Sequence, residues 1–362
     1  MCSSDLTVRR AEGSPSAPVA LHPTPLRPGP RPERSSATTL VAELGSEQLR
    51  VAALLGGRLG KVSALRLAEL AVEGPDGPDL LPGILRALRS SVPAGSEVEL
   101  VAFAVPARVD GCGRIVGTPP DGLPDADGLR SALEEAFCAP VLVDAAAGLA
   151  ALGEARQGAG RGHRDVVLLQ IGETISLGIV SDRRVLRGAH GAAGAIGRIL
   201  LPAHRGVSGL DTDARVPRIG AAESTAPVGF VRADEVVGGT GLARIFTDGS
   251  RPLELRPEVS DRRVKAAARQ GIEGWALLVS DLAAILDPEV TVLGGSIMAT
   301  APGLAPALER RVAELMPAVE GVPAPHLRLG RLGSRAALIG ASIAGRAALQ
   351  AGTIRRPEHR ER

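Results

Sequence analysis

The chain has 362 residues, a formal net charge of +2 and hydrophobic side chains at 44% of its positions. This length is sufficient for two domains that each bury a core. The small net charge excludes a protein whose whole surface attracts nucleic acid or an anionic membrane. No apolar run approaches the roughly 18 to 20 residues of a membrane span, and no signal-peptide pattern opens the chain, so we expect a cytoplasmic protein. Three scattered cysteines without a CxxC pair indicate a reduced chain that has no structural zinc.

The first 38 residues are expected to form a disordered tail or linker. This stretch is rich in Pro, Ser and Arg and shows no hydrophobic periodicity. Such a segment cannot bury a core of its own. We therefore place the start of the folded sequence at Thr39.

Alternating and apolar patterns predict the elements of a first half. Three β-like runs separated by glycine-bearing turns predict strands over 39–44, 49–55 and 61–70. They are followed by a helix over 80–92, a buried strand over 98–109, a helix over 125–137 and a strand over 140–144.

The pattern restarts after a helix over 147–157. Three more strands are predicted over 165–172, 174–181 and 183–189. A helix over 258–286, a strand over 290–296, a helix over 303–316, a strand over 326–332 and a helix over 334–350 complete the chain. Two halves that each open with three consecutive strands predict a duplicated α/β unit with a cleft between its lobes. We expect the lobes at 39–150 and 151–333, with the final helix packing back on the first.

The first hairpin turn of each half is expected to face the cleft, where glycine and threonine would let backbone N–H groups cradle a phosphate. Each turn keeps one glycine, Gly45 or Gly172, but each also carries a carboxylate, Glu47 or Glu173. A carboxylate about 4 Å from a phosphate repels it by about 1 to 4 kcal/mol per unit charge. The turns therefore disfavour a nucleotide triphosphate, unless the two glutamates point into solvent.

Four segments together are specific enough to indicate a family. They read PVLVDAAAGLAALGEARQGAGRG, RRVLRGAHGAAGAIGRI, LDPEVTVLGGSI and LGSRAALIGASIAG. In this order, over about residues 39–350, the sequence resembles the ROK family of bacterial sugar kinases and sugar-responsive transcriptional regulators. The resemblance implies an actin-like (RNase H-like) two-lobed ATPase fold.

The resemblance also implies where a catalytic base should lie. The kinases of the family carry an aspartate in an N-D-A-N-like run, and aligning that run places the aspartate at Ala146. A methyl group cannot accept the proton of a sugar hydroxyl. The sequence therefore predicts a chain that is not an enzyme, a pseudokinase in which no residue is catalytic. The alternative is a ROK-family sugar kinase for ATP-dependent hexose phosphorylation in which Asp144 or Asp110 serves as the base.

Other positions implied by the resemblance are changed as well. The sugar-contacting glutamate of the family falls on Ala195, and the histidine that follows it falls on Arg198. Zinc needs about four ligands, and the stretch after Arg198 offers only His204. We therefore expect neither a metal nor a cofactor. Five glycines are interpreted as vestigial nucleotide-binding positions, or as glycines retained for turn geometry and packing: Gly45, Gly172, Gly178, Gly294 and Gly295.

The leading hypothesis is the sugar- or sugar-phosphate-sensing domain of a transcriptional regulator whose helix-turn-helix is missing from this chain. DNA would be contacted only through that N-terminal module, and the family resemblance implies a homo-oligomer. Candidate ligand contacts are Asp144, His190 and Arg198. Arg198 would favour a phosphorylated or acidic ligand through bidentate pairing, unless it is an exposed arginine on a turn, and His190 is equally compatible with a core histidine. A purely structural subunit is a further alternative.

Overall fold

The computed structural model describes residues 37–74, 77–124, 126–202, 230–246, 262–318 and 323–355. Contacts divide the chain into residues 1–35 and a second unit, 36–362, to which the elements below belong. The expected tail therefore lies outside the described residues, except that Ala37 and Thr38 already belong to the first strand. No helix of the described ranges is long and apolar enough to cross a bilayer.

The first sheet has six strands. Their order is β3-β2-β1-β7-β8, with β4 pairing on β2. The bounds are β1 Ala37–Leu44, β2 Gln48–Leu55, β3 Arg58–Leu59, β4 Ser63–Arg66, β7 Glu97–Val105 and β8 Val141–Ala145. β1 is antiparallel to β2 and parallel to β7, and β7 is parallel to β8. The same half holds the hairpin of β5 (Val72–Gly74) and β6 (Gly77–Asp79) and the helices α1 (Leu67–Leu70), α2 (Leu81–Ser90) and α3 (Ala126–Phe137).

The second sheet repeats the arrangement of the first. Its order is β11-β10-β9-β14-β15, again an antiparallel meander followed by two parallel strands. The bounds are β9 Val166–Ile171, β10 Ile175–Ser181, β11 Arg184–Val185, β14 Val290–Gly294 and β15 Leu327–Leu329. The prediction of a duplicated α/β fold is therefore confirmed.

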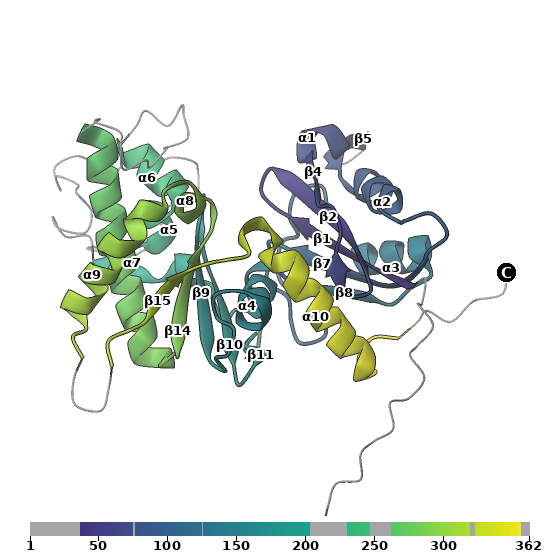
Figure 1. The fold of residues 1–362 in the computed structure, drawn as a ribbon. Coiled ribbons are helices and arrows are strands. Elements are labelled where there is room, and N and C mark those ends of the chain that lie inside the picture. Colours follow the sequence, from purple (N-terminus) through teal and green to yellow (C-terminus); the bar gives the residue numbers. More distant parts are fainter. Residues whose placement is uncertain are drawn as a thin grey trace, which may run out of the picture. The chain divides into compact units, whose positions relative to one another are not determined.

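Helices and a short ribbon accompany the second sheet. They are α5 (Ala233–Val237), α6 (Gly239–Phe246), α7 (Arg262–Leu286), α8 (Ser296–Thr300) and α9 (Ala305–Leu315), with β12 (Leu200–Pro202) paired to β13 (Phe230–Arg232). α7 packs along α9 (Figure 1). Its Trp275 is fully buried and donates from Nε1 to the carbonyl of Val237 at 2.8 Å.

Helices α4 (Ala146–Gln157) and α10 (Ala336–Gln350) pack against each other and join the cores of the two sheets (Figure 1). Their shared core contains Val41 and Ala102 from the first sheet and Val166 and Val292 from the second. Both helices are rich in alanine and glycine, and small side chains allow such close approach of two helix axes. The strand end at β8 therefore opens directly into a helix that is buried on most of its surface.

Two predicted strands are shorter than expected. The run over 61–70 forms strand only over Ser63–Arg66 and then turns into α1. The run over 183–189 pairs only at Arg184 and Val185, because the chain turns at Gly188, which has a φ of 74°. Periodicity does not reveal such ends.

Candidate functional site

A cavity of about 480 Å³ opens at the carboxyl end of β8, where α4 begins. Five segments line it: residues 105–109, 116–120 in part, 144–148, 174–179 in part, and 185–195 in part. They come from both sheets of the described fold. A volume of this order accommodates a small organic molecule such as a monosaccharide.

Asp144 is the one charged residue of β8, next to the end of the strand, and it lines the cavity. Its side chain is only 3% exposed. Both carboxylate oxygens accept a hydrogen bond from Arg187 Nε at 3.2 Å, and Arg187 Nη2 also donates to Oδ2. The backbone N–H of Ala145 donates to Oδ1 at 2.9 Å. The carboxylate is therefore held by a bidentate guanidinium, the strongest kind of ion pair in proteins.

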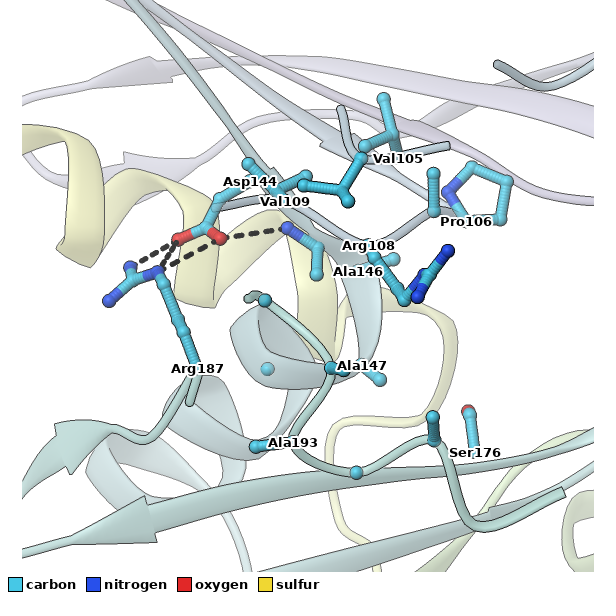
Figure 2. A pocket seen from close by; sticks show the side chains of 18 of the residues that line it. Val105, Pro106, Arg108, Val109, Asp144, Ala146, Ala147, Ser176, Arg187 and Ala193 are labelled. Carbon is cyan, nitrogen blue, oxygen red and sulfur yellow. Dashed lines mark hydrogen bonds and ion pairs between the residues drawn. The ribbon is translucent and has the colours of Figure 1, made fainter. Parts of the chain in front are cut away.

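Alanine methyl groups form the wall beside this ion pair. Ala145 is the N-cap of α4 and makes no side-chain capping bond, and Ala146 and Ala147 follow in the first turn. All three line the cavity, and Figure 2 shows Ala146 and Ala147 between Arg187 and the loop that carries Arg108. Ala146, the position at which the resemblance implied a catalytic base, therefore lies in the wall of the cavity.

The remaining polar groups on the wall are donors or hydroxyls. Arg108 is the third ionisable residue among the described residues of the lining, after Asp144 and Arg187. Thr118, Thr174 and Ser176 supply hydroxyl groups. Asp144 is therefore the one carboxylate that the described part of the lining contains.

The β9–β10 turn is held from outside the cavity. Asp234 in α5 accepts a hydrogen bond from the N–H of Ile175 at 2.6 Å, and Thr240 in α6 donates its N–H to the carbonyl of Glu173 at 3.0 Å. Burial raises the pKa of Asp234 above its ordinary value, and the bond from Ile175 offsets part of that rise. Gly172 donates its N–H to the carbonyl of Thr174 at 3.1 Å.

The β1–β2 turn is closed by its own backbone. Gly45 donates its N–H to the carbonyl of Gln48 at 2.8 Å. In this turn and in the β9–β10 turn, Glu47 and Glu173 are exposed and do not line the cavity. The structure therefore shows the alternative in which both glutamates point into solvent. Glu43, at the end of β1, pairs with Arg50 at 3.3 Å, and burial raises its pKa despite that cation.

The structure brings only one of the three candidate ligand contacts into the cavity. Asp144 lines it, whereas His190 and Arg198 are exposed and are not part of the lining. Arg198 ends a short 3-10 helix, Ile196–Arg198. Asp110, the other carboxylate considered as a base, also lies off the cavity. Its side chain accepts bonds from the N–H groups of Arg114 and Cys112, and the first of these lowers its pKa most.

At two of the glycines that were interpreted as vestigial nucleotide-binding positions, close packing explains why the residue is glycine. A Cβ at Gly178 would collide with the carbonyl oxygen of Ala147, because β10 lies directly against α4 at this point. Gly295 has a φ of 90° as the N-cap of α8, and a Cβ there would collide with Ile171. Gly294 ends β14 beside it. These contacts agree with glycines retained for geometry, but they do not test whether a nucleotide binds.

No cluster of three His, Cys, Asp or Glu side chains suited to a metal occurs in the described ranges. The segment with His204, on which the prediction of no metal was based, lies outside them. That prediction therefore stays a prediction.

Sequence reasoning missed both arginines of the lining. Arg187 lies within a segment used to identify the family, and Arg108 follows β7 in the run VPARV. Charge alone does not distinguish them from the other surface arginines. Arg187 lies 43 residues after Asp144 in the sequence, and only the fold shows that the two side chains are in contact.

Fold and cavity together define a class: a duplicated α/β protein with a ligand-sized cavity that is lined from both of its sheets. A family model described as "ROK family" matches residues 78–347. The chain belongs to the ROK family. The actin-like fold expected from the sequence is confirmed by this match and by the structural neighbours.

Relatives include the bifunctional enzyme NanE/NanK of Brucella melitensis, 33% identical over 257 residues, 66% of this chain and 42% of that protein. A glucokinase of Halalkalibacterium halodurans is 30% identical over 233 residues, 59% of this chain and 65% of that protein. The chain thus spans less than two thirds of the length of either relative.

Solved structures of the same fold come from both branches of the family. A ROK hexokinase from Thermus thermophilus has a TM-score of 0.67 and 25% identity, covering 87% of this chain and 100% of that one. A ROK family transcriptional regulator, a homolog of the E. coli MLC protein, has a TM-score of 0.62 and 20% identity, covering 87% and 79%.

These comparisons correct one prediction from the sequence. The absence of an aspartate at position 146 led to the expectation that the chain is not an enzyme. That expectation is wrong, because the relatives and the hexokinase are named enzymes and sugar kinases, and they point to an enzyme. The physical reason is that one missing side chain does not remove every proton acceptor, since Asp144 lies at the same strand end.

Proposed function

We propose that this chain binds a sugar or sugar phosphate in the cavity at the end of β8. The observation that carries the proposal is the cavity itself, which holds hydroxyl groups, two guanidiniums and a fixed carboxylate around apolar alanine walls. Sugar rings present apolar C–H faces and polar edges, and such mixed walls suit them. The proposal does not depend on His190 or Arg198.

We further propose that this binding serves as the sensing step of a transcriptional regulator. The regulator of known structure has the same fold as this chain, and that likeness supports the proposal at the level of fold. In this proposal the affinity of a separate DNA-binding module for DNA depends on whether the sugar-binding lobes hold a ligand. We expect a homo-oligomer, and multi-angle light scattering tests that expectation: a monomer over the micromolar range would contradict it.

A second candidate function is ATP-dependent phosphorylation of a sugar, which the named kinases among the relatives favour. Phosphoryl transfer needs positioning, charge stabilisation and a group that receives the hydroxyl proton. Asp144 is the carboxylate available in the described lining, and it would have to exchange Arg187 for the sugar hydroxyl. In this candidate, Asp144 is the base, and Arg187 holds its carboxylate in position at the strand end.

Two assays on the same preparation test and separate these functions. A thermal-shift panel of neutral and phosphorylated hexoses and N-acetylhexosamines should contain at least one compound that stabilises the chain. A ligand at 100 times its Kd adds about 2.7 kcal/mol of stability. If no compound of the panel shifts the melting temperature at millimolar concentrations, the proposed binding is wrong.

A coupled ATP-consumption assay with the compounds that bind then separates sensing from catalysis. Sugar-dependent ADP release that Asp144→Asn abolishes would establish the kinase. Binding without ADP release at any sugar and Mg²⁺ concentration would leave sensing as the function.

A further inference from the structure

The charges on the cavity wall do not balance. Among the described residues that line it, the ionisable ones are Arg108, Asp144 and Arg187. Asp144 and Arg187 neutralise each other through their bidentate pair. Arg108 therefore leaves one unbalanced positive charge on a wall that is otherwise apolar or hydroxylic.

Arg108 is an exposed residue that has no ion pair within the described part of the chain, and its backbone position is defined. Its carbonyl accepts a hydrogen bond from the N–H of Val116 at 2.8 Å, which fixes the backbone. Its guanidinium lies close to Gly117, because a Cβ built on that glycine would lie 3.0 Å from Nη2. Gly117 has a φ of 92°, and the hydroxyl-bearing Thr118 follows it on the wall. Arg108 and Thr118 thus both line the cavity, on either side of Gly117.

The two guanidiniums occupy different sides of the cavity. Figure 2 shows Arg187 bound to Asp144 on one side of Ala146 and Arg108 on the other. Because Arg187 is occupied by Asp144, Arg108 is the cation that a ligand meets. Its guanidinium offers five N–H donors and no acceptor.

Acceptors for ligand hydroxyl groups are scarce by comparison. The carboxylate of Asp144 already accepts from Arg187 and from the N–H of Ala145. Thr118 and Thr174 each carry a hydroxyl that can donate or accept, whereas the hydroxyl of Ser176 already donates to Gln170 Oε1 at 3.3 Å. The five donors of Arg108 are therefore the main unpaired polar feature of the wall, and phosphate and carboxylate groups are the strongest acceptors for them.

We infer that the ligand is a sugar that carries an anionic group, either a phosphate or a carboxylate, and that Arg108 binds that group. This inference rests on the proposed function and adds the chemical class of the ligand and the residue that selects it. The sugar ring lies over the alanine wall, and the Asp144–Arg187 pair shapes the opposite side.

Isothermal titration calorimetry on the full chain tests the inference with probes that share a ring. Glucose, glucose 6-phosphate and glucuronate differ at one carbon, and inorganic phosphate supplies the anion without the ring. We expect the wild type to bind glucose 6-phosphate or glucuronate at least about tenfold more tightly than glucose, since a hydrogen bond to a charged group contributes that much. Which of the two binds more tightly identifies the anion as phosphate or carboxylate.

Three variants locate the effect. Arg108→Gln should lower the affinity for the charged sugar to that for glucose, and Arg108→Lys should keep part of the preference because it keeps the charge. Arg86→Gln is the matched control, since Arg86 is an exposed arginine on α2 away from the cavity and should leave all affinities unchanged. Circular dichroism confirms that each variant is folded.

The results that overturn the inference differ from those that overturn the proposed function. If glucose binds as tightly as both charged sugars, or if Arg108→Gln binds the charged sugar as well as the wild type does, the inference is wrong and the binding of sugars stands. If phosphate alone binds as tightly as glucose 6-phosphate, the ring contributes nothing, and the site is for an inorganic anion. If no probe binds the wild type and no compound of the thermal-shift panel stabilises it, the proposed function fails and the inference fails with it.

Discussion

At the scale of single residues, the ion pair of Asp144 and Arg187 determines the chemistry of the cavity. A carboxylate that is 3% exposed is costly to bury unless it is paired and hydrogen-bonded. Here one guanidinium satisfies both oxygens. The pair thus keeps a charged acid at a strand end that is otherwise lined with alanine.

Replacing Asp144 by Asn should lower the free energy of unfolding by about 1.5 to 3 kcal/mol, the contribution typical of a hydrogen bond to a charged group. Urea unfolding of Asp144→Asn, Arg187→Gln and the double variant measures the coupling between the two residues. Because they contact each other, the double variant should lose less stability than the two single variants together. Strictly additive losses would show that the pair does not form.

Asp234 gives a pH-dependent prediction at the same scale. Its pKa is raised by burial, so the folded state binds its proton more tightly than the unfolded state. Its contribution to stability is therefore fully present below the ordinary aspartate pKa and is lost as the pH rises through the higher folded-state value. Relative to Asp234→Asn, the wild type should lose stability as the pH rises above about 4, the ordinary aspartate pKa.

The control for this experiment is Asp281→Asn, which changes an exposed carboxylate on α7. Measured at the same pH values, it shows the effect of replacing a surface carboxylate by an amide, and the pH trend of Asp234→Asn is compared with it. A wild type that gains stability relative to Asp234→Asn with rising pH would reverse the sign and disprove the account of Asp234.

At the scale of elements, the contact between β10 and the start of α4 positions two segments that line the cavity. Gly178 allows it, because any Cβ there meets the carbonyl of Ala147. Gly178→Ala should cost about 1 to 3 kcal/mol, as overpacking in a rigid core does, and should weaken ligand binding by displacing the start of α4. Gly111→Ala is the control, since a Cβ at Gly111 meets nothing within 4 Å. Equal unfolding midpoints for the two variants in urea would contradict this account.

The elements of the fold were largely predictable from the sequence, and the exceptions have physical causes. The nearly continuous apolar runs of β1 and β9 and the helical period of α7 are local patterns that indicate burial directly. The helices α5 and α6 were not predicted, because they are short and are separated by Gly238. Their role in holding the β9–β10 turn comes from contacts with residues far away in the sequence, such as that of Asp234 with Ile175.

The site was less predictable than the fold. Asp144 was a candidate because it ends an apolar strand, which is where ligands bind in α/β sheets. The two arginines of the lining are distinguished only by tertiary contacts. Of the other two candidates, Arg198 was chosen from its family position and His190 was not, and both are exposed and lie off the cavity. Sequence motifs locate a strand end, whereas the direction of each long side chain depends on the packing around it.

At the scale of the whole molecule, α4 and α10 place residues of both sheets in one core, and the cavity is lined from both sheets. A ligand in the cavity therefore contacts both halves of the duplicated fold at once. Such a ligand stabilises the arrangement of the two halves to which it binds best. A change in that arrangement could act on a DNA-binding module in a regulator, or bring reacting groups together in a kinase.

The most direct test of the central claim, that a sugar-type ligand binds in this cavity, is calorimetric titration of a variant in which the cavity is filled. Ala193 lines the cavity beside Arg187, and Ala193→Phe places a ring in the volume that the ligand needs. Ala299→Phe, at an exposed position of α8, adds the same ring away from the cavity. The account predicts that the compound with the highest affinity for the wild type binds Ala299→Phe equally well and loses at least about tenfold in affinity, about 1.4 kcal/mol, for Ala193→Phe. Undiminished binding to a folded Ala193→Phe would contradict it.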